Sequence, residues 1–248
     1  MDFAKKKVLI VGTKKSGMAA LSLLKLHGAD TVLYDGNEEA KEEEIRAELP
    51  AGVTTDICIG KLPEELKSSI QLVVISPGVP IDSPLVLEFQ KMEIPVWGEI
   101  ELAYAFEKGK VLAITGTNGK TTTTALLGQI MEDVTSKSIT VGNIGIPYTQ
   151  MVSETTEDSV TVAEISSFQL ETVYEFKPVV SAILNVTPDH LNRHHTMECY
   201  VETKEKIAAN QTKAETCVLN YEDSYTYVII SEMCDGDNNC RYYTLKVR

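Results

Sequence analysis

The residues best suited to chemistry lie in the run VLAITGTNGKTTTT, residues 111–124. An apolar stretch ends at Thr115. A loop bounded by Gly116 and Gly119 follows, and Lys120 then opens a stretch of helical character. Successive backbone N–H groups in such a loop, together with the N-terminus of a helix, favour the binding of phosphate. The segment therefore predicts a phosphate-binding loop.

Two side chains of this segment have the chemistry that a nucleoside triphosphate requires. Lys120 can reach the phosphate that is transferred, and the hydroxyl of Thr121 can bind Mg²⁺. The strict pattern G-x-x-x-x-G-K-[ST] is not met, because Ile114 stands six positions before Lys120. A tight glycine turn that happens to precede a lysine is the alternative. We favour phosphate binding because the strand, the helix and the G-K-T sequence occur together.

A carboxylate and an imidazole are expected beside this loop. Glu164 ends the apolar run SVTVAE, and His190 follows the apolar run AILNV. The carboxyl ends of parallel strands meet at one edge of a sheet, where ligands bind. Mg²⁺ prefers oxygen ligands, so the carboxylate is the stronger candidate of the two. Each residue alone could be a solvated loop residue, and Asp189, His194 and His195 are alternatives to His190.

A second glycine-bounded loop, GTKKSG at residues 12–17, resembles a dinucleotide-binding turn but lacks its middle glycine. Asp35 ends the next strand, at the place of a ribose-binding acid. A mononucleotide or a nucleotide-sugar diphosphate is at least as plausible a ligand as NAD, with Lys14 or Lys15 meeting its charge. A plain turn with solvated lysines is the alternative. Residues 76–78 follow a further strand and should face the same crevice.

Short apolar runs alternate with helix-like stretches along the chain, which predicts parallel sheets with right-handed crossovers. The fold class is therefore α/β. We expect a Rossmann-like parallel-sheet domain at residues 1–98 and a second α/β domain with the phosphate loop at residues 99–248, because the composition shifts near Gly98. Strands are expected at 7–12, 31–35, 71–75, 94–98, 111–115, 138–141, 159–166, 179–186 and 216–220. Helices are expected at 16–28, 38–48, 83–93, 98–110, 121–133, 167–176 and 197–210, and residues 221–248 should form one helix, one turn and one strand.

Composition excludes several classes of protein. The 248 residues carry 23 Lys and Arg against 36 Asp and Glu, a net charge of −13, and 43% are hydrophobic. This hydrophobic share argues against disorder, and the acidic charge without a basic stripe argues against nucleic-acid binding. No apolar run is long enough to span a membrane or to form a signal peptide. Five cysteines without a C-x-x-C pair fit reduced thiols, so we expect a cytoplasmic protein.

Four segments together resemble the Mur ligases of bacterial peptidoglycan synthesis. They are GTNGKT (116–121), GNIG (142–145), EISSFQLE (164–171) and NVTPDHLNRH (185–194). The segment EISSFQLE most narrowly resembles the members that add D-glutamate to UDP-N-acetylmuramoyl-L-alanine. The resemblance extends from about Lys7 to Asn220, and it departs from the family at Asn192 and His195, where members commonly carry an acid and a small residue.

The resemblance implies a UDP-substrate-binding domain followed by a P-loop-like ATPase domain, acting as a monomer. It implies catalytic roles for Lys120, His190 and Lys204. The implied ATP-binding residues are Gly116, Thr117, Asn118, Gly119, Lys120, Thr121 and Thr122. Two Mg²⁺ ions are implied at Thr121, Glu164, His190 and a carbamylated Lys204. The implied contacts to the UDP substrate are Thr13, Lys14, Lys15, Ser16, Asp35, Gly36, Ser76, Pro77, Gly78 and Asn143.

The implied reaction has two steps. The substrate carboxylate attacks the γ-phosphate of ATP to form an acyl phosphate, and the amine of D-glutamate then attacks the acyl carbon. Family members continue into a further part of the central domain and a third domain, so we expect this chain to be an incomplete form that binds the UDP substrate but has little activity alone. The alternatives are another Mur-type or folylpolyglutamate-type ligase, and a nucleotide-binding module without catalysis.

Overall fold

The computed structural model describes residues 2–143, 145–226 and 241–245. Its internal contacts divide the chain into two units, which are described separately below. The first unit is Met1–Phe106 with Pro147–Ser153, and the second is Glu107–Ile146 with Glu154–Arg248. The segment after Gly98, which the sequence analysis assigned to the second domain, therefore packs with the first sheet as far as Phe106.

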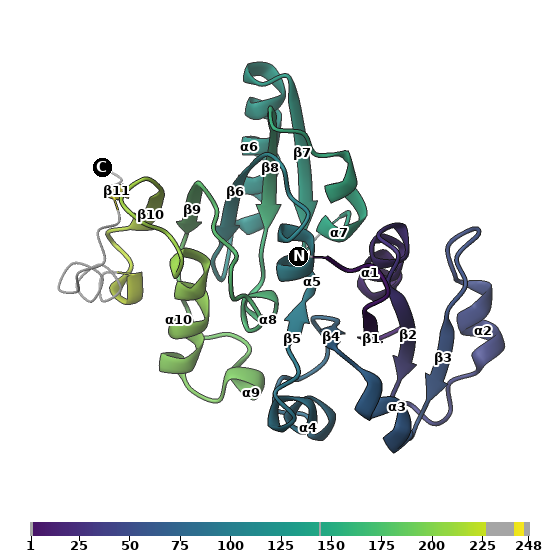
Figure 1. The fold of residues 1–248 in the computed structure, drawn as a ribbon. Helices are drawn as coiled ribbons and strands as arrows, with labels where there is room; N and C mark the ends of the chain where they lie inside the picture. The colour runs from purple at the N-terminus through teal and green to yellow at the C-terminus, as the bar shows by residue number, and fades with distance from the viewer. Residues whose placement is uncertain (1, 144, 227–240, 246–248) are drawn as a thin grey trace. The chain divides into compact units, whose positions relative to one another are not determined.

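The first unit is built on a five-stranded parallel sheet of order β3-β2-β1-β4-β5 (Figure 1). Its strands are β1 (Lys7–Val11), β2 (Asp30–Asp35), β3 (Asp56–Ile59), β4 (Leu72–Ile75) and β5 (Val96–Gly98). Its helices are α1 (Lys15–Leu26), α2 (Glu42–Ala47), α3 (Glu64–Ser69), α4 (Pro84–Lys91), α5 (Glu99–Tyr104) and α7 (Tyr148–Met151).

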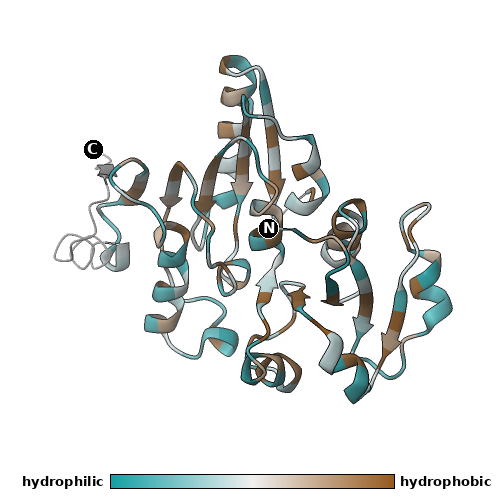
Figure 2. Ribbon diagram, viewed as in Figure 1, coloured by the Kyte–Doolittle hydropathy of each residue, from teal (hydrophilic) through white to brown (hydrophobic). Residues whose placement is uncertain are grey.

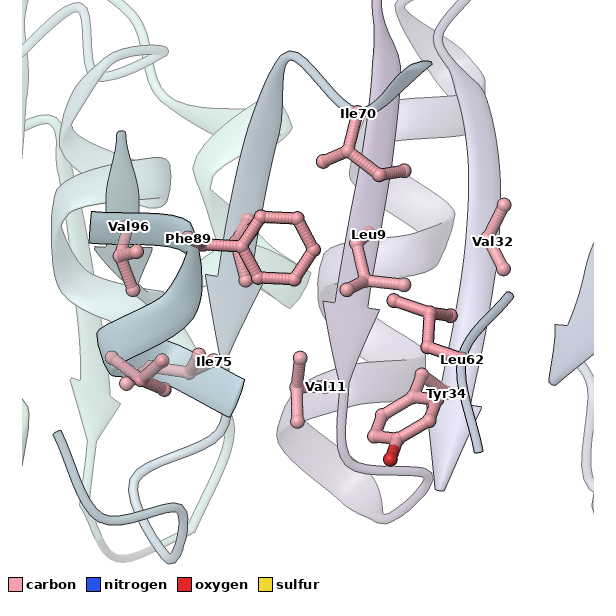
Figure 3. Packing of buried hydrophobic residues seen from close by; sticks show 11 residues of the cluster. Leu9, Val11, Val32, Tyr34, Leu62, Ile70, Ile75, Phe89 and Val96 are labelled. Atoms are coloured by element: carbon pink, nitrogen blue, oxygen red, sulfur yellow. The ribbon is translucent and has the colours of Figure 1, made fainter. Parts of the chain in front are cut away.

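Both faces of this sheet are buried, as expected for parallel strands with helical crossovers. Figure 3 shows one face, where Leu9 and Val11 of β1 meet Phe89 of α4 in a cluster of buried side chains. Alternate residues of β1, Val8 and Ile10, are fully buried on the opposite face, beside α1, which contacts β1, β2 and β4. The strands of the sheet are mostly hydrophobic in Figure 2, whereas α2 is mostly hydrophilic.

The second unit is built on a six-stranded parallel sheet of order β11-β10-β9-β6-β8-β7. Its strands are β6 (Lys110–Thr115), β7 (Lys137–Gly142), β8 (Ser159–Glu164), β9 (Val180–Ile183), β10 (Thr216–Asn220) and β11 (Arg241–Leu245). Its helices are α6 (Lys120–Val134), α8 (Ser167–Leu170), α9 (Leu191–His194) and α10 (Met197–Glu205). Two 3₁₀ turns, η1 (Val152–Glu154) and η2 (Lys206–Ala208), complete the described elements.

Helix α6 covers one face of this second sheet. Its side chains Leu127 and Met131 pack on a cluster of Ile114 from β6 and Val160 and Val162 from β8. Because β6 and β8 are neighbours, the loop that follows β6 and the loop that follows β8 open at the same edge of the sheet. This arrangement brings the predicted phosphate loop and Glu164 to one place.

The parallel α/β prediction is confirmed, and the main differences concern helix lengths and small elements. The helix expected at 167–176 is shorter in the structure, where α8 ends at Leu170. Asn210 donates hydrogen bonds to the carbonyls of Tyr174 and Phe176, so tertiary contacts hold the rest of this segment. The expected helix at 197–210 ends as α10 at Glu205, and 3₁₀ geometry follows.

Strand β3 and helix α3 were not predicted. The expected final strand is present as β11. The helix and turn expected between residues 221 and 240 lie largely outside the described residues. None of the helices in the described part of the chain has the length and apolar character that crossing a membrane requires.

Candidate functional site

The loop between β6 and α6 has positive φ angles at its two glycines. Gly116 has a φ of 153° and Gly119 a φ of 81°, conformations that L side chains rarely adopt. A Cβ atom on Gly116 would also lie 3.1 Å from the Cβ of Leu184. Helix α6 begins immediately after Gly119, and Thr123 donates to the Gly119 carbonyl. The amides before Thr123 at this helix start are the ones an α-helix leaves without an intrahelical partner.

Two amides in the middle of the loop are already occupied. The N–H of Thr117 donates to the carbonyl of Asn185 at 2.9 Å, and the N–H of Asn118 donates to Oδ1 of Asn185 at 2.8 Å. The sequence predicts that the whole loop binds an anion through its amides, as an anion-binding nest, and these two bonds correct that expectation. In the structure the nest is confined to the end of the loop and the first turn of α6.

Two lysines converge on the start of this loop. Nζ of Lys120 lies 3.0 Å from the carbonyl oxygen of Gly116 and 2.9 Å from that of Thr117. Nζ of Lys204, which comes from α10, lies 3.0 Å from the same Gly116 oxygen. The Gly116 carbonyl is therefore a shared acceptor for two side chains that are far apart in the sequence.

Lys204 is only 1% exposed, although it lies in a hydrophilic sequence. Its pKa is lowered from 10.5 to about 7, chiefly by burial and also by the charge of Lys120, while Asp189 opposes both effects. The ring of Tyr200, one helical turn earlier on α10, has its centroid 4.5 Å from Nζ of Lys204. A buried lysine with this pKa has a substantial neutral fraction near pH 7, and a neutral amine is a nucleophile.

These groups line one cavity of about 250 Å³. Its lining residues are Gly116, Lys120, Asn143, Ser166, Ser167, Phe168, His190, Tyr200 and Lys204. The structure thus brings five predicted site residues together around one space. Ser166, Ser167, Phe168 and Tyr200 were not singled out from the sequence. The position of Tyr200 four residues before Lys204 was the one pattern that could have indicated it.

Glu164 lies next to this cavity at the end of β8. It is 2% exposed, and its Oε1 accepts a hydrogen bond from Nδ2 of Asn143 at 3.1 Å. The backbone N–H of Asn143 donates to the Glu164 carbonyl. The glycine before Asn143 makes this approach possible, because a Cβ on Gly142 would lie 2.0 Å from that carbonyl oxygen. A buried carboxylate beside a side-chain amide supplies oxygen donors of the kind that Mg²⁺ prefers.

The other predicted metal ligands are less tightly gathered. Thr121 is exposed in the first turn of α6, whereas Glu164 is buried at the end of β8. In the part of the chain that the structure describes, no group of three or more His, Cys, Asp and Glu side chains is arranged to hold a metal ion. A site built from Glu164 and Thr121 therefore needs phosphate oxygens to complete its coordination.

His190 and His194 have different environments. His190 is exposed, and its backbone has a positive φ of 53°. The centroid of its ring lies 4.9 Å from that of Phe168. His194 is buried, with Nε2 2.9 Å from Oγ of Ser167. Burial lowers the pKa of His194 to about 4, and the neighbouring cations contribute, Arg193 first. Of the sequence alternatives, His190 therefore lines the cavity and His194 packs behind it, while His195 is exposed on the surface.

The first unit gathers its predicted residues at the carboxyl ends of β1, β2 and β4. The hydroxyl of Thr13 donates to Oδ2 of Asp35 at 2.6 Å, and the amide of Ser76 donates to the Val11 carbonyl. Lys14 and Lys15 are exposed at the start of α1, and Ser16 follows them. Oγ of Ser76 is buried without a hydrogen-bond partner among the described residues, as a site for a polar ligand would leave it. Gly36, Pro77 and Gly78 lie in the same loops.

Both parts of the chain match models of known protein families. Residues 114–246 match the family model of the Mur ligase middle domain, and residues 6–98 match that of the Mur ligase MurD-like N-terminal domain. The chain is 63% identical to UDP-N-acetylmuramoylalanine–D-glutamate ligase of Lachnospira eligens over 225 residues, which cover 91% of this chain and 50% of that protein. The protein of the same name from Lachnoclostridium phytofermentans is 61% identical with the same coverage. The chain spans about half the length of the curated relatives it matches.

Solved structures show the same fold at low sequence identity. UDP-N-acetylmuramate:L-alanyl-gamma-D-glutamyl-meso-diaminopimelate ligase from Neisseria meningitides superposes with a TM-score of 0.60 at 14% identity, covering 97% of this chain and 78% of that one. UDP-N-acetylmuramate-alanine ligase from Thermotoga maritima gives a TM-score of 0.54 at 21% identity, covering 97% and 53%. The family models together account for most of the sequence, and the chain therefore belongs to the Mur ligase family.

Proposed function

We propose that the chain is the part of an ATP-dependent ligase that binds ATP and UDP-N-acetylmuramoyl-L-alanine, and that the enzyme adds D-glutamate to this substrate through an acyl phosphate in peptidoglycan synthesis. The observation that carries the proposal is the convergence of Lys120 and Lys204 on the Gly116 carbonyl, in a cavity that the phosphate loop helps to line. The names of the relatives supply the identity of the two substrates that are joined, UDP-N-acetylmuramoyl-L-alanine and D-glutamate.

The second unit would hold ATP by its phosphates. The amides of Gly119, Lys120, Thr121 and Thr122 would bind phosphate oxygens, while Thr117 and Asn118 hold the loop in shape. Nζ of Lys120 would exchange its hydrogen bonds to the Gly116 and Thr117 carbonyls for contacts with the transferred phosphate. Its charge would stabilise the transition state there. Glu164, Thr121 and His190 would hold two Mg²⁺ ions together with Lys204. Mg²⁺ neutralises the charge that develops on the phosphate oxygens.

Lys204 would act after carbamylation. Its neutral amine attacks CO₂, a C–N bond forms, and one proton is lost, which leaves a carbamate with an added negative charge. The lowered pKa of about 7 provides the neutral amine, and the nearby charge of Lys120 stabilises the carbamate. His190 and Asn143 would face the acyl substrate, because both line the cavity that contains Lys204.

The first unit, with residues 1–98 as its core, would hold the UDP part of the substrate. The amides and lysines at the start of α1 suit a diphosphate, and Asp35 suits a ribose hydroxyl. The buried hydroxyl of Ser76 would find its partner in this ligand. The acidic net charge supports a protein without a nucleic-acid partner, and we propose that it acts as a monomer in the cytoplasm without a membrane partner.

The test combines binding and turnover. The purified chain is titrated with UDP-N-acetylmuramoyl-L-alanine and with Mg-ATP, and then incubated with both, bicarbonate and D-glutamate, while ADP and the ligated product are followed by mass spectrometry. We expect both ligands to bind and little product to form, because the matched region is half of the relatives' length. Addition of the remaining half of the Lachnospira eligens protein should raise turnover, and Lys120→Met should abolish it.

Other results would favour the alternatives. Failure of the folded chain to bind either nucleotide would contradict the proposal. Binding of a folate in place of the UDP substrate would indicate a folylpolyglutamate-type ligase. Binding of the UDP substrate without ATP consumption, even with the added half, would indicate a nucleotide-binding module without catalysis.

A further inference from the structure

The side-chain amide of Asn185, which follows strand β9, holds one residue of the phosphate loop. Oδ1 of Asn185 accepts the N–H of Asn118 at 2.8 Å, and Nδ2 of Asn185 donates to the carbonyl of Asn118 at 3.0 Å. These two bonds occupy both backbone polar groups of one loop residue. Only a carboxamide places a donor and an acceptor side by side in this way, and Asn supplies it on a short stem.

The carboxamide continues the pairing of two strands beyond the end of the sheet. Strands β6 and β9 pair in parallel as far as Thr115, and Leu184 then donates to the Thr115 carbonyl at 3.0 Å. Thr117 next donates to the carbonyl of Asn185 at 2.9 Å. The loop turns away after this point, because Gly119 has a positive φ and α6 begins. Among the described residues, Asn118 has no backbone partner on the segment after β9, and the side chain of Asn185 supplies its hydrogen bonds instead.

A second group of contacts holds the residue before it. Oγ1 of Thr117 accepts the N–H of Thr187 at 3.0 Å, and it lies 3.2 Å from the Thr187 carbonyl and 3.3 Å from the hydroxyl of Tyr200. Thr117 and Asn118 are therefore both directed at the segment that leaves β9. Neither residue has its backbone N–H available for a ligand in this arrangement.

We propose that Asn185 is a positioning residue for the phosphate site, which holds the loop so that the amides from Gly119 to Thr122 point at a polyphosphate before it binds. The proposal rests on the proposed function, because it concerns the same loop. A loop that is already in its binding conformation has less ordering entropy to lose when a ligand arrives. Removal of the carboxamide should therefore weaken polyphosphate binding, although Asn185 itself need not touch the ligand.

The experiment measures affinity and stability separately on the full 248-residue chain. Tripolyphosphate and ATP, each with Mg²⁺, are titrated by calorimetry into the parent protein and into Asn185→Leu and Asn185→Ala. Leu keeps the size of the side chain and Ala removes it, so that at least one variant should remain folded. Asn210→Ala is the matched control, because Nδ2 of Asn210 also holds loop carbonyls, those of Tyr174 and Phe176, in a different part of the unit.

We expect the Asn185 variants to bind both probes about tenfold more weakly, the effect of losing one or two hydrogen bonds that hold a loop. Asn210→Ala should lower the melting temperature but leave both affinities within twofold of the parent. Unchanged affinities in a folded Asn185 variant would overturn the proposal, and so would an equal loss in Asn210→Ala, because affinity would then follow stability. If the parent itself bound neither probe, the proposed function would fail, a result distinct from either of these.

Discussion

The ammonium groups of Lys120 and Lys204 share one acceptor, since each Nζ lies 3.0 Å from the carbonyl oxygen of Gly116. Two like charges at one oxygen are unfavourable unless one of them is lost. Lys204 is the buried member of the pair, and its pKa is lowered to about 7, first by burial and then by Lys120. One backbone carbonyl thus links the phosphate loop to the neutral form of a buried lysine.

Replacement of Lys120 should make Lys204 easier to protonate. In Lys120→Met the neighbouring charge is gone and burial remains, so the pKa of Lys204 should rise from about 7 but stay below 10.5. The measurement is a pH titration of the Lys204 side chain by NMR on protein with isotope-labelled lysine. Lys110→Met, which removes an exposed lysine at the start of β6, should leave this titration unchanged. An identical titration in Lys120→Met would contradict the electrostatic coupling.

The residues around the phosphate loop differ in how far the sequence could predict them. The signal for the loop is local in the sequence, because an apolar strand, two glycines and a lysine lie within a few positions of one another. Together they predict the backbone of the loop and its chemistry. Lys204 is not local. It lies in the hydrophilic sequence YVETKEKIAAN, which by pattern is a solvated helix face, and only the family resemblance indicated it. Its burial depends on packing that brings α10 against the loop.

The roles of Asn185 and His194 could not be predicted from the sequence either, because both depend on contacts with residues far away in the chain. Asn185 bonds to a residue 67 positions earlier, and His194 bonds to Ser167, 27 positions earlier. In the sequence Asn185 lies inside the strand expected at 179–186, and His194 lies in the polar stretch after it, where it was one of the alternatives to His190. The parallel sheets were predictable because apolar runs are long and regular there, whereas β3 has only the short run DICI, whose side chains are partly buried or exposed. Short elements on the edge of a sheet carry too few residues for a periodic signal.

Gly17 should be essential for packing in the first unit. A Cβ atom at this position would lie 1.9 Å from the carbonyl oxygen of Gly12, a backbone atom that cannot move aside without moving the loop. We expect Gly17→Ala to lower the free energy of unfolding by about 2–3 kcal/mol despite the better helix propensity of Ala. Urea unfolding followed by Trp97 fluorescence reports on this unit, because Trp97 is the chain's one tryptophan.

Ser22→Ala on the same helix is the control for Gly17→Ala. The Ser22 hydroxyl only bonds back to the Met18 carbonyl of its own helix, so its removal should change stability by less than about 0.5 kcal/mol. Equal stability of the two variants would show that the loop and α1 can separate at no cost.

His194 should make the second unit less stable in acid. Its pKa is about 4 in the folded chain and 6.5 as a free side chain, so the unfolded chain binds more protons between these values. Stability from the neutral histidine is therefore complete above pH 6.5 and is lost as the pH falls toward 4. With an allowance for solvent screening, the free energy of unfolding falls by about 2 kcal/mol over this range.

The variant His194→Phe tests this expectation by urea unfolding between pH 4.5 and 7, followed by circular dichroism. Phe keeps the ring beside Phe168 and Tyr200 and cannot be protonated. Its stability at pH 7 should be lower, because Ser167 loses its partner, but its decline with acid should be shallower than in the parent. His195→Asn, at an exposed position, should keep most of the parent's pH dependence, because His195 makes the smallest of the charge contributions to the lowered pKa of His194. Parallel declines in His194→Phe and the parent would show that His194 does not titrate in this range.

His195 occupies a strained backbone position that glycine should relieve. Its φ is 67° and its ψ is −49°, and Thr196 donates to the His194 carbonyl at 2.8 Å, which closes a three-residue turn of the rare positive-φ form. Such a position costs about 1–3 kcal/mol for a residue with a Cβ, and glycine costs about 0.5–1 kcal/mol in chain entropy. His195→Gly should therefore stabilise the second unit by about 1 kcal/mol in urea unfolding. His195→Ala keeps the Cβ and hence the strain, so it should gain nothing, and equal stability of the Gly and Ala variants would rule out strain at this turn.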